Sequence, residues 1–388
     1  MSCFEPADPS HKEIIRLLGK INLKNRDERI MYKLLDDGLT QYESKTDPGL
    51  IENEDDKLEK ADSSNIKADQ CKCANTINKS VGLKIDERNH KKSECHVYFT
   101  MLDDIPPPVY QQTFHQWKAM MDLNFNFWKM RKRKIIYLQP LDDFPDFVNN
   151  STFNVNKKTL NFFELLQLFA SVFFDGFEVQ LLPTLDTVQN DWKITRRNHK
   201  TTGQKQQLVT DVIAYLSKQR PKDGFCMLGL TWTDLYPTPE LNFVLGEASM
   251  PEYAGAFSFG RYEPKSYKDG VPPPEIERFD GFLIWKMLKV LSHETCHIFG
   301  QRHCVHFHCS MNESTSMVQA LRQPIFLCPV CLRKLHKVCK FDIKTRYKKL
   351  LDIFQAVNAQ YPHEYLENAV HWLEDMLVEI EKAETGYM

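Results

Sequence analysis

Three histidines and one glutamate occur at spacings that suit metal binding and acid–base chemistry within the segment HETCHIFGQRHC. His293 and His297 are four residues apart, so on a helix both imidazoles lie on one face and can reach the same ion. Glu294 is adjacent to the first of them and can reach a water held by that ion. Gly300 can end the helix in the left-handed conformation, after which the chain can turn back and present His303. Three histidine ligands with an open fourth position are typical of a catalytic zinc site.

A helix that begins after Asp280 can position the first two histidines. Aspartate is a favoured N-cap residue, and apolar residues recur at helical spacing along the segment that follows it. By average composition HExxH alone occurs by chance in roughly one chain in a hundred of this length, and the further Gly and His reduce that several hundredfold. The alternative is a helix whose histidines are ordinary surface or core residues.

Four cysteines follow the third histidine and could form a second metal site. They are Cys304, Cys309, Cys328 and Cys331. Two pairs separated by an eighteen-residue loop fit a tetrahedral Cys₄ zinc site, although the C-x₄-C spacing of the first pair is slightly wide. Two alternatives stay open: the thiols are buried and bind no metal, or His306 or His308 replaces Cys309. We expect Cys296 and Cys339 to be core or surface thiols.

The composition is typical of an ordinary soluble protein and gives no reason to expect nucleic acid or a membrane as partner. The chain has 388 residues, a formal net charge of −2, 42% hydrophobic and 26% charged residues. No apolar run reaches the ~18 residues of a membrane span, and the first residues lack the apolar region of a secretory signal. We therefore expect a monomer in the cytoplasm, with the nucleus as a second location. In such a reducing compartment the eleven cysteines favour metal ligands or buried thiols over disulfides.

Four regions are predicted along the chain. Residues 11–36 show helical periodicity, so residues 1–43 are predicted to form an N-terminal helical segment, and residues 44–95 are polar, charged and typical of a disordered insertion. The insertion contains Cys71 and Cys73 as CKC, a weak metal-binding signal for which unligated thiols are the simpler interpretation. The metal-binding domain is predicted for 97–340, and two C-terminal helices for 341–388.

Alternating helices and strands predict an α+β fold in which a sheet is flanked by helices. The predicted helices are 111–130, 160–177, 204–219, 342–357 and 363–384. The predicted strands are 134–141, 178–183, 224–232 and 254–262. The strand 224–232 is apolar on both faces, which favours the sheet interior. The strand 254–262 is interpreted either as an exposed edge or as a buried strand.

Together these motifs resemble those of a known family. HExxHxxGxxH is the zinc signature of the metzincins, and the continuation through Cys304, C-x₄-C-x-M ending at Met311, and C-P-V-C is similar to the archaemetzincins. The segments 229–237, 242–250 and 257–262 also look like family segments. The resemblance covers roughly residues 97–340, and residues 44–95 have no counterpart in it.

The resemblance implies a metzincin-like zincin fold, with a twisted mixed sheet flanked by helices, an active-site helix and a Cys₄ zinc subsite. It implies a catalytic zinc on the three histidines, Glu294 as general base, and a structural zinc on the four cysteines. Met311 would be the Met-turn residue that packs beneath the metal and does not bind it. Peptides or proteins would be the substrates, and the strand 254–262 is a candidate edge for binding them in extended form. The competing hypothesis is a non-catalytic zinc-binding interaction protein with two structural zinc sites.

Overall fold

The computed structural model describes residues 9–34, 112–200, 203–260, 278–314, 320 and 323–385. The expected insertion 44–95, with its CKC motif, lies outside these residues, so the interpretation of that segment stays a prediction. No helix in the described ranges is long and apolar enough to cross a membrane.

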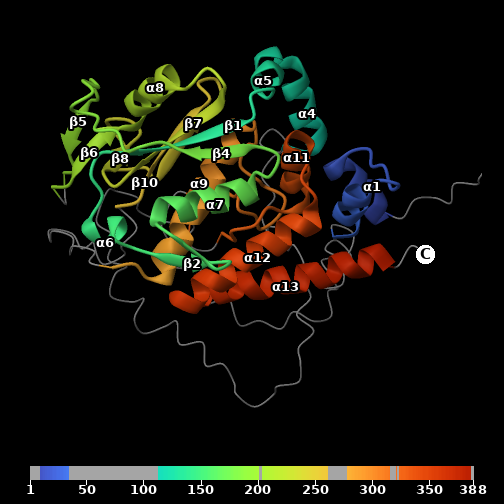
Figure 1. Ribbon diagram of the computed structural model, residues 1–388. Coiled ribbons are helices and arrows are strands. Elements are labelled where there is room, and N and C mark those ends of the chain that lie inside the picture. The colour runs from blue at the N-terminus through green and yellow to red at the C-terminus, as the bar shows by residue number, and fades with distance from the viewer. Residues whose placement is uncertain are drawn as a thin grey trace, which may run out of the picture.

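A mixed five-stranded sheet forms the centre of the molecule (Figure 1). Its order is β4 (Glu178–Leu181), β1 (Ile135–Leu141), β7 (Gly224–Thr231), β10 (Ala254–Ser258) and β9 (Gly246–Ser249). The first four strands are parallel to their neighbours, and β9 runs antiparallel to β10. Every residue of β7 is buried, which agrees with the continuous apolar run that predicted an interior strand.

Helices cover both faces of this sheet. The helix α8 (Val209–Gln219) packs against β7 and β10 on one face, whereas α7 (Phe162–Phe173) contacts β4 and α9 (Gly281–Ile298) contacts β9 and β10 on the other. Alternate strand residues enter separate cores: Tyr137 and Met227 belong to the core beneath α8, and Ile136 and Leu228 belong to the larger core around α7 and α9. The predicted mixed sheet flanked by helices is therefore confirmed.

The remaining elements surround this centre. The N-terminal part of the chain contributes the helices α1 (Pro9–Leu18), α4 (Phe114–Leu123), α5 (Phe125–Met130) and α6 (Asp146–Asn149). Two small sheets contain β2 (Phe153–Val155) with β3 (Lys158–Leu160), and β5 (Arg196–Asn198) with β6 (Lys205–Leu208) and β8 (Asp234–Tyr236). The C-terminal part has α11 (Pro329–Cys339), α12 (Ile343–Gln360) and α13 (Glu364–Thr385). Figure 1 shows α12 and α13 side by side, where α12 packs on α7 and β2 and α13 packs on α9.

Three predicted elements differ in detail from the structure. The helix expected over 111–130 is broken at Asn124, whose side chain accepts the N–H of Phe127 at 2.9 Å and starts α5. The helix expected over 204–219 begins as the strand β6, which pairs with β8. The strand β10 lies between β7 and β9 and is buried throughout, so the edge of the sheet is β9. The interpretation of 254–262 as a buried strand is therefore the correct one.

Candidate metal centres

The helix α9 begins and ends at the residues that the sequence indicated. Asp280 accepts the N–H of Leu283 at 2.7 Å and caps the N-terminus. At the other end the N–H of Gly300 donates to His297 and the N–H of Gln301 donates to Cys296, which is the Schellman arrangement. Gly300 has φ +76°, and a Cβ there would meet the side chain of Met121. The left-handed conformation therefore favours glycine at the point where the chain turns back.

The three histidines converge beyond this turn. The Nε2 atoms of His293 and His297 are 3.2 Å apart, and nitrogen atoms of both lie within 4.8 Å of one from His303. Two ligands of a tetrahedral zinc ion with Zn–N bonds of ~2.05 Å are separated by about 3.3 Å. The donor spacing of the first pair therefore fits zinc.

Hydrogen bonds to backbone carbonyls orient two of these rings. The Nδ1–H of His293 donates to Ser310 at 2.6 Å, and the Nδ1–H of His297 donates to Gln301 at 2.7 Å. Each bond fixes the tautomer in which Nε2 carries the lone pair. Burial lowers the pKa of His293 far below its usual value, that of His297 to about 4 and that of His303 as well. All three imidazoles are thus neutral at pH 7, as metal ligands must be.

Glu294 lies beside the histidines in a largely buried position, with 15% of its side chain exposed. Its Oε1 is 3.9 Å from His293 Nε2. Burial, together with the nearby carboxylate of Glu247, raises the pKa of Glu294 to about 8. A divalent cation in the site would lower this pKa again. The carboxyl group can therefore exchange a proton near neutral pH.

The edge strand β9 lies directly against Glu294. A Cβ on Gly246 would be 2.9 Å from Glu294 Cγ, so only a glycine leaves room for this carboxyl side chain. The next residue, Glu247, is partly buried, and burial raises its pKa. Neither residue was singled out as a site residue from the sequence. They lie in the segment 242–250, which only the family resemblance indicated.

The four cysteines form a second group, and all four are buried. Their sulfur atoms lie within 4.8 Å of one another, and Cys304 Sγ is 3.7 Å from Cys328 Sγ. Zn–S bonds of ~2.3 Å in a tetrahedral site require about 3.8 Å between sulfurs. The group contains Cys309, whereas His308 is exposed and His306 is not part of it. The geometry therefore favours Cys₄ over a histidine substitution.

Backbone amides and one asparagine hold the first cysteine pair in place. The N–H groups of Met311 and Cys328 donate to Cys309 Sγ at 3.4 and 3.2 Å. The Nδ2 of Asn312 donates to the carbonyls of Cys304 and Phe307, both at 2.8 Å, and its Oδ1 accepts the N–H of Cys309 at 2.7 Å. Asn312 carries no sequence signal for this role, because its partners are defined only by the folded loop.

The thiols differ in their protonation. Hydrogen bonds from Cys309 and Cys328 lower the pKa of Cys304 far below its usual value. Burial raises the pKa values of Cys309 and Cys328 well above the usual range. A soft cation at the centre would replace these thiol protons, because coordination deprotonates a thiol. Met311 is fully buried in the same loop and its carbonyl accepts the N–H of Cys304 at 2.7 Å.

Cys296 and Cys339 are buried and lie outside the group of four. Burial raises the pKa of Cys339 to about 12 and that of Cys296 well above its usual value. Both are therefore core thiols, one of the two interpretations that the sequence left open.

A known protein family matches the part of the chain that contains both the three histidines and the four cysteines. Residues 275–337 match the model of peptidase family M54. The chain is 32% identical over 238 residues to archaemetzincin-2 of Rattus norvegicus, covering 57% of this chain and 64% of that protein. It is 29% identical over 250 residues to archaemetzincin-1 of Homo sapiens, covering 59% of this chain and 48% of that protein. The chain thus matches less than two thirds of the length of either relative.

Solved structures are also similar to part of the chain. One is an archaemetzincin from Methanopyrus kandleri, with 22% identity, a TM-score of 0.38, and coverage of 53% of this chain and 96% of that one. Another is a zinc-dependent peptidase from Methanocorpusculum labreanum, with 18% identity, a TM-score of 0.36, and coverage of 52% and 99%. The family match, which spans both groups of candidate ligands, and the curated relatives confirm the resemblance to the archaemetzincins.

Proposed function

We propose that this chain hydrolyses peptide bonds with the help of two zinc ions. The Nε2 atoms of His293 and His297 and a ring nitrogen of His303 would hold the catalytic ion, and the four buried cysteines would hold the structural one. The observation that carries the proposal is the convergence of neutral imidazoles, 3.2 Å apart at the first pair, beside a buried carboxyl group. Three protein ligands leave a fourth position for the reaction, whereas four thiolates complete a closed site.

The chain's own residues then have distinct tasks in the reaction. When bound, the zinc ion supplies a Lewis acid and lowers the pKa of the attacking water. Glu294 accepts the proton of that water and delivers it to the leaving amine. Among the described strands only β10 pairs with β9, so a peptide can bind in extended form along the outer side of β9, next to Glu294.

The competing function is a zinc-binding interaction protein without activity. A purely structural site has no use for a buried carboxyl group beside its first ligand, because an unpaired acid in an apolar position costs stability. The burial of Glu294, with a pKa raised to about 8, therefore supports the catalytic alternative.

Activity on a peptide library separates the two functions. We expect the purified zinc-loaded chain to hydrolyse a subset of peptides, to lose this activity when a chelator removes the metal, and to regain it with added Zn²⁺. Mass spectrometry of the products measures the cleavage and also shows whether terminal or internal bonds are cut. A fully loaded chain that cleaves no peptide would support the interaction protein instead.

The Glu247→Gln substitution tests whether the charge of Glu247 raises the pKa of Glu294. The Glu247 carboxylate raises the pKa of Glu294, so its removal lowers that pKa and keeps the base ionised to lower pH. The acidic limb of kcat/KM should therefore move toward lower pH, as measured in a pH–rate profile of peptide cleavage. Glu252→Gln, an exposed acid beyond the same strand, is the matched control and should leave the limb in place. An unchanged limb in the Glu247 variant would contradict the link.

The state of the cysteines supports the proposed location. All seven cysteines in the described part of the chain are free of disulfides. Free buried thiols persist in a reducing compartment such as the cytoplasm or the nucleus.

A further inference from the structure

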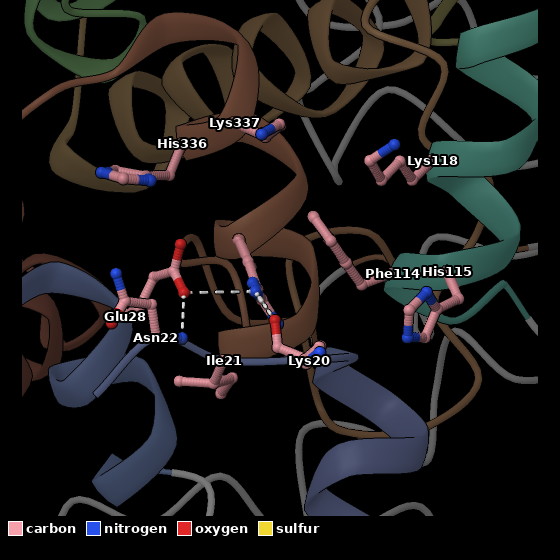
Figure 2. Close-up of a pocket in the computed structure, with 10 residues that line it drawn as sticks. Lys20, Ile21, Asn22, Glu28, Phe114, His115, Lys118, His336 and Lys337 are labelled. Atoms are coloured by element: carbon pink, nitrogen blue, oxygen red, sulfur yellow. Dashed lines mark hydrogen bonds and ion pairs between the residues drawn. The ribbon is translucent and has the colours of Figure 1, made fainter. Parts of the chain in front are cut away.

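A cavity of about 490 Å³ lies between the N-terminal segment, α4 and α11, on residues other than the metal ligands (Figure 2). Its volume is within the range of about 300–1,000 Å³ that is typical of small-molecule sites. The lining comes from three separate parts of the chain. It consists of Lys20, Ile21, Asn22, Glu28, Phe114, His115, Lys118, Arg333, His336 and Lys337.

Cationic side chains dominate this lining. Three lysines and one arginine face a single carboxylate, that of Glu28, which already accepts the N–H of Asn22 at 2.7 Å and lies 3.5 Å from Arg333. Lys118 forms an ion pair with Asp122. Lys20 and Lys337 are exposed, and neither forms an ion pair within the described ranges. The cavity therefore has an excess of positive charge that the lining itself does not neutralise.

The walls of the cavity are fixed by buried interactions. The guanidinium of Arg333 donates to the carbonyls of Leu18, Gly19 and Lys20 and lies 4.2 Å above the ring of Phe114. These contacts tie the end of α1 to α11 and α4. On the far wall His336 Nε2 is 3.1 Å from an Asp27 carboxylate oxygen. The frame of the cavity is therefore fixed before a ligand arrives, and binding would order mainly the exposed lysine side chains.

We propose that this cavity binds a small molecule with two or more phosphate groups. Lys20 extends from the loop after α1, Lys337 from α11 and Lys118 from α4, so the amines approach the space from different sides (Figure 2). A compact ligand with separated negative charges can reach several of them, whereas a singly charged one cannot. Lysine amines are strongly hydrated point charges that suit phosphate oxygens.

The location gives such a ligand a defined structural effect. The helix α11 carries three lining residues and begins with the second cysteine pair. A molecule that bridges α11 and the loop after α1 stabilises the folded state by mass action, because the unfolded chain has no such site.

Binding of fructose 1,6-bisphosphate to the full zinc-loaded chain tests the proposal. Calorimetric titration should show saturable binding of the bisphosphate, weaker binding of fructose 6-phosphate and none of fructose, with a matching rise in the thermal unfolding midpoint. The double substitution Lys20→Gln with Lys337→Gln should weaken the bisphosphate affinity on the order of tenfold. Raising the salt concentration should weaken binding further.

Two exposed lysines elsewhere provide the matched control. Lys129→Gln with Lys348→Gln removes the same charge from α5 and α12 and should leave the affinity unchanged. Zinc content measured after titration shows whether the ligand acts by removing metal. The proposal is wrong if the bisphosphate does not bind at millimolar concentration, if both double variants bind it like the unmodified chain, or if fructose binds equally well.

Discussion

Glu294→Gln lowers peptide hydrolysis by about 10²–10⁴-fold and leaves both zinc ions bound, if Glu294 is the general base. Glutamine keeps the shape of the side chain and removes its basicity. The position is buried, with the side chain packed against Gly246 of β9, so a change of shape would disturb the edge strand while this substitution does not. Turnover of a cleaved peptide, metal content and thermal unfolding are the three measurements.

Two further variants separate loss of the base from loss of the metal. His297→Ala removes a proposed ligand and should abolish activity together with the catalytic ion, leaving one zinc per chain. Glu313→Gln applies the same amide substitution to an exposed carboxylate 3.9 Å from His303 Nδ1 and should keep full activity. Full activity of the Glu294 variant would disprove the mechanism even if the zinc site is real.

The double substitution Cys328→Ser with Cys331→Ser should remove one zinc ion and destabilise the fold severely. Zinc binding to structural sites in small domains contributes roughly 10–16 kcal/mol, which is comparable with the whole stability of a typical domain. Activity should fall too, because Cys304 directly follows His303 and the same loop presents both sites. Metal analysis and calorimetric unfolding are the measurements.

The matched control uses the other two buried thiols of this region. Cys296→Ser with Cys339→Ser places the same polar atoms in the core outside the group of four. This variant should lose stability through the buried hydroxyls and yet retain both zinc ions. A native protein with a single tightly held ion, or a Cys328/Cys331 variant that keeps two, would rule out the structural site.

The convergence of the candidate histidine ligands could be predicted because its geometry is set locally. The spacing of His293 and His297 on one helix face, the cap at Asp280 and the turn at Gly300 each depend on a few neighbouring residues. The interior strand β7 was also predictable, because burial on both faces leaves a continuous apolar run.

What the sequence left undecided depends on contacts between distant segments. The apolar composition of β10 suits an edge strand as well as an interior strand. Only its pairing with β9 shows that β10 is an interior strand. The start of the predicted helix 204–219 becomes β6 because β8 lies alongside it. Glu247 and Asn312 gain their roles from partners that fold beside them, so no local pattern indicates either residue.

The position of α12 and α13 has a consequence for synthesis on the ribosome. These helices cover α7 and α9, yet they are made after every strand of the central sheet and after all the proposed metal ligands. Until residues 343–385 emerge, the apolar residues of α9 that face α13 are exposed to solvent. Completion of the fold is therefore a late event in translation, and a nascent chain that stalls before α12 exposes the kind of apolar surface that chaperones bind.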